Sequence, residues 1–219
     1  MTRVQTRAAA AAAAAQVWYA AYGSNLAEDR FLCYVRGGRP SGSKVKLQGC
    51  RDKTLPVESR GARLPLRPFI AGRSKSWDGH GVAFVGTRWR RDESTHVRIW
   101  LVRKSQLEDI VAQENGLQSG AISIDSMELS RDHHWDLKIT GKYPRIIRVG
   151  TVDSRPVVTC TTADPSLQRR PNAPASAYLG WMAKGLRELS WTDDEIANYL
   201  FGIRGINRTS VNTDAVRAR

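Results

Sequence analysis

The chain has 219 residues, of which 41% are apolar, and its mean hydropathy is −0.43. This length fits one domain of roughly 150 to 190 residues with tails, since single cores rarely need more than about 200 residues. No run of about 18 apolar residues is present, so the sequence predicts no membrane-spanning helix and favours a soluble protein.

Basic residues outnumber acidic ones by 34 to 21, which gives a formal charge of +13. They are spread along the chain, with short clusters at residues 88–91 and 168–170. Neither cluster belongs to a helix-turn-helix or RNA-binding signature. We interpret the charge as a solvated basic face, and nucleic acid is not the expected partner.

The cysteines Cys33, Cys50 and Cys160 are odd in number, widely separated and form no C-x-x-C pair. They predict neither a disulfide framework nor a zinc site, and they favour a reducing, cytoplasmic location. Residues 1–16 faintly imitate a signal peptide, with Arg3 and Arg7 before eight alanines. We interpret them as an Ala-rich extension of a single domain.

The predicted domain covers residues 17–204, and the polar residues 205–219 are expected to form a disordered tail. Its first element is a buried strand at residues 17–21, followed by a helix at residues 26–35. The residues expected on the inner side of that helix are Leu26, Phe31 or the stem of Arg30, Cys33 and Tyr34.

A Gly-Ser-Asn turn separates this strand from this helix. Gly23 allows backbone conformations that a Cβ forbids and lets the chain approach a ligand closely. Ser24 and Asn25 are favoured N-cap residues. Because N–H groups at a helix start are unpaired, the turn predicts a small anion site that suits a carboxylate.

The other predicted strands are short and punctuated by Gly and Pro: residues 45–47, 64–66, 69–70, 81–85, 97–102, 121–129, 145–149 and 155–161. The strands at 81–85 and 97–102, joined by a charged loop, are expected to form a hairpin. Such short, antiparallel-looking strands with few helices favour a mixed or closed sheet over a doubly wound one.

A further helix is predicted at residues 104–112, with Ser105 as N-cap and Glu108 three residues later, and its end lies near Asn115 and Gly116. One or two terminal helices are predicted over residues 176–189 and 192–201. A capping-box pattern runs from Thr192 to Glu195, at the start of the second of these segments.

Four segments carry motifs: residues 22–26 (YGSNL), 74–83 (SKSWDGHGVA), 104–120 and 174–179 (PASAYL). Together they resemble the γ-glutamylcyclotransferase-like superfamily. The first matches its signature loop, and the second is similar to its Trp-Gly-Gly strand start. The third looks like the helix end that carries its catalytic glutamate, and the fourth is similar to its Pro-Ser-x-x-Tyr segment. The resemblance implies an α+β fold, a small mixed β-barrel with peripheral helices.

The chain departs from the family pattern at two places. Asn115 stands between Glu114 and Gly116, and no acidic residue lies three positions ahead of Glu114. The Trp-Gly-Gly element is also interrupted and reads WDGHG at residues 77–81.

The reaction that the resemblance implies is the cyclisation of a γ-glutamyl group to 5-oxoproline. The free α-amine attacks the γ-carbonyl of the same molecule and a second amine is released. Attack from a held conformer can be worth about 7 to 11 kcal/mol. The implied general acid and base is Glu114, because a partly desolvated glutamate has a raised pKa. No cofactor and no metal are required.

The resemblance also implies a binding site for the small γ-glutamyl molecule. Its α-carboxylate would bind the backbone amides of the Gly-Ser-Asn turn, while two tyrosines would wall the glutamyl group and donate hydroxyls. The implied site residues are Tyr22, Gly23, Ser24, Asn25, Leu26 and Tyr178.

Structural alternatives remain open for each of these residues. Glu114 could be a solvated residue at a helix C-terminus, Tyr178 could be a packing residue, and residues 23–25 could form an ordinary turn. We expect Glu108 and Asp109 to be helix-surface charges, with Glu108 as the reserve candidate for the base.

Two other functions compete with cyclisation. The chain could be a non-catalytic member that binds an acidic metabolite or nucleic acid through its basic surface. Metal-dependent amide hydrolysis, such as deacetylation, lacks the required Asp/His ligand set, and His80 and the pair His133 and His134 have no companion ligands. The amine partner and the oligomeric state cannot be read from the sequence.

Overall fold

The structure is a computed structural model that describes residues 16–130 and 134–206. Apart from Gln16 the predicted Ala-rich extension lies outside these residues, as do His133 and the predicted tail from residue 207 onward. Within the two described ranges, no helix has the length and apolar character needed to span a bilayer.

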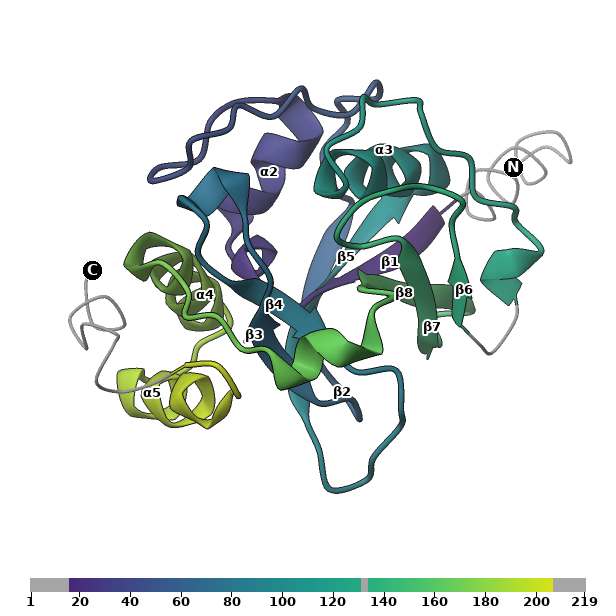
Figure 1. Cartoon of the computed structure of the whole chain (residues 1–219). Helices are drawn as coiled ribbons and strands as arrows, with labels where there is room; N and C mark the ends of the chain where they lie inside the picture. The colour runs from purple at the N-terminus through teal and green to yellow at the C-terminus, as the bar shows by residue number, and fades with distance from the viewer. Residues whose placement is uncertain (1–15, 131–133, 207–219) are drawn as a thin grey trace, which may run out of the picture.

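A six-stranded mixed sheet forms the centre of the molecule (Figure 1). Its strand order is β2-β5-β1-β8-β7-β6, in which β1 and β8 are parallel and all other neighbours are antiparallel. The strands are β1 (Gln16–Ala21), β2 (Glu58–Leu64), β5 (Thr95–Arg103), β6 (His134–Asp136), β7 (Arg145–Val152) and β8 (Arg155–Thr161).

A separate two-stranded sheet pairs β3 (Pro68–Ala71) with β4 (Val82–Val85). Thr161 joins the two sheets, because its hydroxyl donates to the Val85 carbonyl at 2.7 Å and accepts from the Val85 amide at 3.2 Å. The α+β class is confirmed, but the expected barrel is wrong. A barrel needs its edge strands to pair, whereas β2 and β6 form the two open edges of the six-stranded sheet.

The central strand β1 explains why the first apolar run is continuous. Residues 17–21 are all buried, since β1 lies between β5 and β8 and both of its faces are covered. Its register with β5 pairs Trp18 with Leu101 and Tyr19 with Trp100. The chain leaves this buried strand directly into the Gly-Ser-Asn turn.

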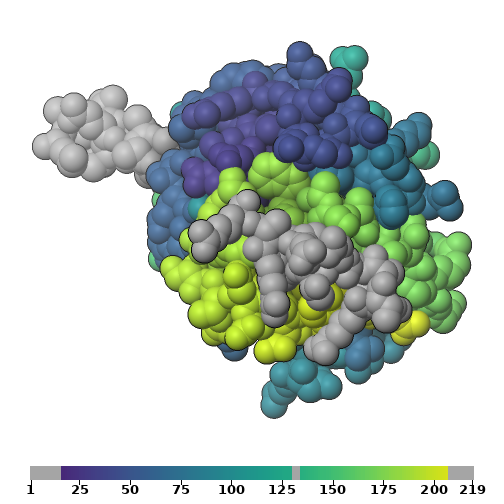
Figure 2. Space-filling model, turned by 90° about the vertical axis from the view of Figure 1, so that its left-hand side faces the viewer, coloured from purple at the N-terminus to yellow at the C-terminus, as the bar shows by residue number. Residues whose placement is uncertain are grey.

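Four α-helices surround the sheet in the described part of the chain: α2 (Glu28–Arg36), α3 (Lys104–Glu114), α4 (Ser176–Glu188) and α5 (Asp193–Gly202). Helices α2 and α3 lie next to each other, with α3 against β1 and β5, and α4 packs on the turn after β1 (Figure 1). Figure 2 shows α4, in green, directly against the purple early part of the chain.

Several local predictions were wrong because tertiary pairing overrode local pattern. Strand β4 pairs with β3, and β5 pairs with β2 and β1, so the expected hairpin between them does not form. Residues 121–129 form no strand, and residues 45–47 contribute only a bridge from Leu47 to Gly38. The N-cap of helix α3 is Arg103 rather than Ser105, and the Arg103 amide donates to Gln106 Oε1 at 3.0 Å. The Thr192–Glu195 capping box is confirmed.

Candidate functional site

The turn after β1 is a single 3-10 turn rather than the start of an α-helix. Ser24–Leu26 form this turn (η1), in which the Leu26 amide donates to the Gly23 carbonyl at 3.0 Å. Helix α2 begins only at Glu28, and Ala27 occupies its N-cap. Ser24 and Asn25 therefore do not cap α2, and the turn instead directs the Asn25 side chain toward the end of α3.

Gly23 is required for close approach rather than for an unusual φ angle. Its φ is −113°, which other residues also adopt. A Cβ at this position would lie 2.5 Å from the Tyr178 hydroxyl oxygen and 3.3 Å from the Ala83 Cβ. The Tyr178 hydroxyl accepts a hydrogen bond from the Ala83 amide at 2.9 Å. Tyr178 thus holds the turn against β4, and only a glycine leaves room for this contact.

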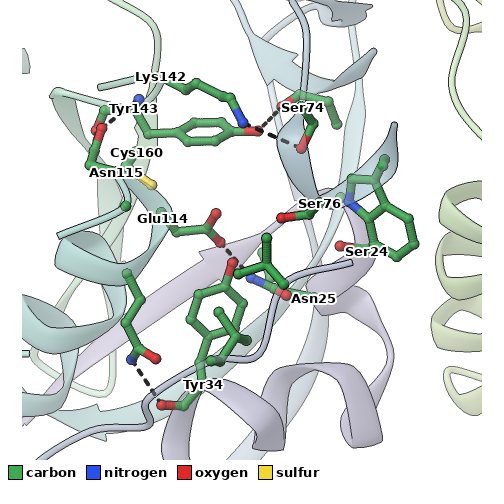
Figure 3. A pocket seen from close by; sticks show the side chains of 18 of the residues that line it. Ser24, Asn25, Tyr34, Ser74, Ser76, Glu114, Asn115, Lys142, Tyr143 and Cys160 are labelled. Atoms are coloured by element: carbon green, nitrogen blue, oxygen red, sulfur yellow. Dashed lines mark hydrogen bonds between the residues drawn. The ribbon is translucent and has the colours of Figure 1, made fainter. Parts of the chain in front are cut away.

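Glu114 faces the turn from the last residue of α3. Its Oε1 accepts a hydrogen bond from Asn25 Nδ2 at 2.7 Å (Figure 3). The Trp100 indole fixes the backbone of Asn25, because Nε1 donates to the Asn25 carbonyl at 3.1 Å. Residues far apart in the sequence therefore place one carboxyl group beside the Gly-Ser-Asn turn.

A cavity of about 530 Å³ opens between this carboxyl group and the turn. Of the residues proposed from the sequence, six line it: Tyr22, Gly23, Ser24, Asn25, Glu114 and Tyr178. Leu26 does not line it. Leu26 is fully buried, and α4 crosses it so closely that a Cβ on Gly185 would lie 2.4 Å from the Leu26 Cβ. Leu26 anchors the turn from behind.

The pKa of Glu114 is raised above its ordinary value, mainly because the carboxyl group is buried. The positive charge of Arg30 opposes this rise, as do hydrogen bonds from Tyr34 and Asn25 and the charge of Lys142. A carboxyl group with a raised pKa is suited to take and return a proton near neutral pH.

The cavity is strongly basic. Its lining includes Arg30, Arg73, Lys75 and Lys142, whereas Glu114 is the only carboxylate among the described residues that line it. Lys142 Nζ donates to the Ser74 hydroxyl at 3.3 Å across the cavity (Figure 3). Burial lowers the pKa of Lys142, an effect that Glu114 opposes and Lys75 strengthens. An anionic ligand would relieve this accumulation of positive charge.

Asn115, the residue that departs from the family pattern, holds the segment that carries Lys142. Its Oδ1 accepts from the Tyr143 amide at 2.9 Å, and its Nδ2 donates to the Tyr143 carbonyl at 3.1 Å. The Tyr143 hydroxyl in turn donates to the Ala83 carbonyl at 3.1 Å. Asn115 therefore binds residues 142–143 to the end of α3 and completes one wall of the cavity.

Tyr22 and Tyr178, the two tyrosines predicted to bind substrate, line the cavity with their rings, and their hydroxyls already form hydrogen bonds within the protein. The Tyr22 hydroxyl donates to the Cys160 carbonyl at 2.6 Å, so its proton is already used within the protein. The Tyr178 hydroxyl accepts from Ala83, and its ring meets the Trp77 ring edge-on at 5.5 Å. Both side chains are buried and shape the cavity.

Glu108 and Asp109 were expected on the helix surface, and this prediction was wrong. Both are buried: Glu108 is 8% exposed and Asp109 is 0% exposed. Glu108 accepts from Lys104 Nζ at 2.6 Å and from the Ile124 amide at 2.9 Å. Neither residue lines the cavity, so Glu108 does not serve as the reserve base there.

Sequence reasoning missed several lining residues, among them Arg30, Tyr34, Lys142, Tyr143 and Cys160. Arg30 had a usable signal, since it lies on the inner side of α2 one turn before Tyr34. No sequence signal marks Lys142 or Tyr143 as a lining residue, because their position beside the cavity depends on the hydrogen bonds between Asn115 and Tyr143.

Within the described residues, no group of three or more His, Cys, Asp or Glu side chains could hold a metal ion. His80 Nδ1 lies 3.3 Å from the Ala173 carbonyl, and His134 lies in β6. Cys33, Cys50 and Cys160 are free thiols in the structure.

No family model matches the chain. Among curated proteins, histone deacetylase 5 of Arabidopsis thaliana is 30% identical over 188 residues, which cover 78% of this chain. The chain spans only 28% of that protein's length. The similarity therefore concerns one part of the plant protein.

Two solved structures share the fold. One, titled γ-glutamyl cyclotransferase, is 15% identical, covers 91% of this chain and 95% of its own, and has a TM-score of 0.50. The other, an uncharacterized human protein, is 16% identical, covers 89% of this chain and 90% of its own, and also has a TM-score of 0.50. The motifs pointed to the correct fold, although its sheet is not closed into a barrel: this chain has the γ-glutamyl cyclotransferase fold.

Proposed function

We propose that the protein cyclises the γ-glutamyl group of a γ-glutamyl amine or γ-glutamyl amino acid to 5-oxoproline and releases the free amine. The observation that carries the proposal is the contact between Glu114 and Asn25, inside a cavity that the Gly-Ser-Asn turn lines. A fold shared with a γ-glutamyl cyclotransferase supports the same reaction class.

Glu114 would act first as the base and then as the acid. The ionised carboxylate takes a proton from the substrate α-ammonium, and the resulting amine attacks the γ-carbonyl carbon. The new C–N bond closes the five-membered ring. The old C–N bond then breaks as Glu114 returns the proton to the departing nitrogen. The ring nitrogen must lose a second proton to become the amide N–H of 5-oxoproline, and this proton passes to the released amine, which leaves as an ammonium ion. Glu114 itself takes one proton and returns one, so it ends ionised.

Binding of the substrate would depend on charge and shape. The basic lining attracts the α-carboxylate, and residues 23–25, whose backbone amides would bind it, line the same cavity. The rings of Tyr22 and Tyr178 restrict the glutamyl chain to a folded conformer. Because the nucleophile and the electrophile belong to one molecule, holding this conformer supplies much of the catalysis.

A second candidate function is the binding of an acidic metabolite without turnover. It is favoured by the four cations that surround a single carboxylate in the cavity. This candidate predicts that an anionic ligand binds whether or not Glu114 can ionise.

The two candidates are separated by incubating the purified protein with a panel of γ-glutamyl amines, γ-glutamyl amino acids and glutathione. Mass spectrometry would follow 5-oxoproline. Cyclisation predicts product from at least one compound, its loss in Glu114→Gln, and unchanged product in Asp194→Asn, which removes an exposed carboxylate on α5. Absence of product from every compound, with binding detected by calorimetry, would instead support the binding function.

A further inference from the structure

Arg30 is a buried cation that the proposed reaction does not use directly. It lies on α2 and is only 5% exposed. Its guanidinium stands over the Tyr34 ring, 4.8 Å from the centroid, and Nη2 donates to the Tyr34 hydroxyl at 3.4 Å. Its Nε and Nη1 atoms are buried and have no hydrogen-bond partner among the described residues.

Burying a guanidinium with two unpaired nitrogen atoms destabilises the folded state, so a functional reason for Arg30 is expected. A guanidinium stays charged at any working pH, and a buried charge is tolerated when another charge balances it. No carboxylate forms a direct ion pair with Arg30 in the described part of the chain. The carboxylate that its charge acts on is Glu114. The Tyr34 hydroxyl, which accepts from Arg30, points toward the Glu114 carboxyl group in the same cavity (Figure 3).

Every element around Glu114 contributes a group that could influence its charge. The groups are Tyr19 from β1, Tyr22 directly after that strand, Asn25 from η1, Arg30 and Tyr34 from α2, Cys160 from β8, Tyr178 from α4, and Lys142 and Tyr143 from the segment held by Asn115. Burial raises the pKa of the tyrosines and of the cysteine, so they are neutral. Of the four cations that line the cavity, Arg30 and Lys142 are the two whose charge acts on Glu114, and Arg30 is the more deeply buried.

We propose that Arg30 is a positioning residue that acts through the Tyr34 hydroxyl to keep Glu114 ionised and directed at Asn25 before a substrate binds. The inference rests on the proposed cyclisation. When Glu114 takes the proton of the α-ammonium, its neutral form no longer balances Arg30. The carboxyl group is then ready to return the proton to the leaving nitrogen, while Arg30 and Tyr34 keep their own protons.

The test measures the ionisation of Glu114 directly in Arg30→Met, Arg30→Lys and Tyr34→Phe. The protonated-carboxyl band in infrared difference spectra is titrated against pH and assigned by its loss in Glu114→Gln. Arg30→Met should move the midpoint to higher pH by about one unit, because burial is then opposed by one charge fewer. Arg30→Lys should restore most of the difference, and Tyr34→Phe should raise the midpoint by a smaller amount. The acid limb of kcat/KM should move in parallel.

Arg36→Met is the matched control, since Arg36 is an exposed arginine on the same helix and lies outside the cavity. Its midpoint should equal that of the unaltered protein. Unchanged midpoints in both Arg30→Met and Tyr34→Phe, with folding intact by circular dichroism, would overturn the proposal. If Arg30→Met fails to fold, the titration midpoints of Arg30→Lys and Tyr34→Phe test the proposal instead. The titration measures the ionisation of Glu114 without any substrate turnover. Failure of the proposed cyclisation would therefore be seen in the 5-oxoproline assay and not in the titration.

Discussion

Helix α3 carries carboxylates in two regions that differ in burial and in how fully their oxygens accept hydrogen bonds: Asp109 is fully buried, whereas Glu114 is partly exposed. Asp109, in the middle of the helix, accepts from the Arg51 amide at 2.8 Å, from Arg51 Nε at 3.1 Å and from the Gly120 amide at 2.7 Å. Glu114, at its end, meets side chains that also border a cavity. Backbone amides that bind a carboxylate fix loops to the helix, whereas a carboxylate held by side chains beside open space can react.

The largest effect is expected from Glu114→Gln, which keeps the shape of the side chain but removes its charge. The rate of 5-oxoproline formation should fall by about 10²- to 10⁴-fold, because the general acid and base is lost. Urea denaturation should show a folded protein, and calorimetry should still detect an anionic ligand. Activity within threefold of the unaltered protein would contradict the assignment of Glu114.

Asp109→Ala should show the opposite behaviour on the same helix. The substitution removes the acceptor of the Arg51 and Gly120 amides, whose hydrogen bonds are partly buried, so the free energy of unfolding should fall by about 1 to 3 kcal/mol. The activity per folded molecule should stay unchanged at a temperature where the variant is folded. A loss of activity in a stable variant would remove the distinction between the two regions of α3.

Gly23→Ala tests the turn that faces Glu114. The added methyl group collides with the Tyr178 hydroxyl, and we expect a loss of about 1 to 3 kcal/mol in the free energy of unfolding together with lower activity. The double variant Gly23→Ala/Tyr178→Phe removes the colliding oxygen and should regain part of that stability. No difference between the single and double variants would show that the contact is not the cause.

The smallest effect is expected from Lys142→Met at the cation side of the cavity. Loss of one partly screened charge should raise KM about fivefold with little change in kcat. The difference should shrink as salt is added, because ions screen the charge. Glu128→Gln, outside the cavity, serves as a control for a change of charge alone. If KM is the same in Lys142→Met and in the unaltered protein, Lys142 does not contribute to substrate binding, and the turn at residues 23–25 remains as the binding element.

The sequence alone determined the elements that are specified by residues close together in the chain. The apolar run of β1, the periodic pattern of α3 and the Thr192–Glu195 capping box each appeared where they were predicted. The turn at residues 23–25 and Glu114 were also identified from motifs that lie 89 residues apart, counted from Asn25 to Glu114.

Only the tertiary structure decided which strands pair and which charged groups surround Glu114. The pairing of β4 with β3, the open edges at β2 and β6, and the burial of Asp109 all depend on contacts between distant segments. Arg30 and Lys142 reach the cavity from two such segments. Local sequence specifies backbone preference and hydrophobic faces, but the electrostatic surroundings of a buried carboxyl group arise only when the chain has closed around it.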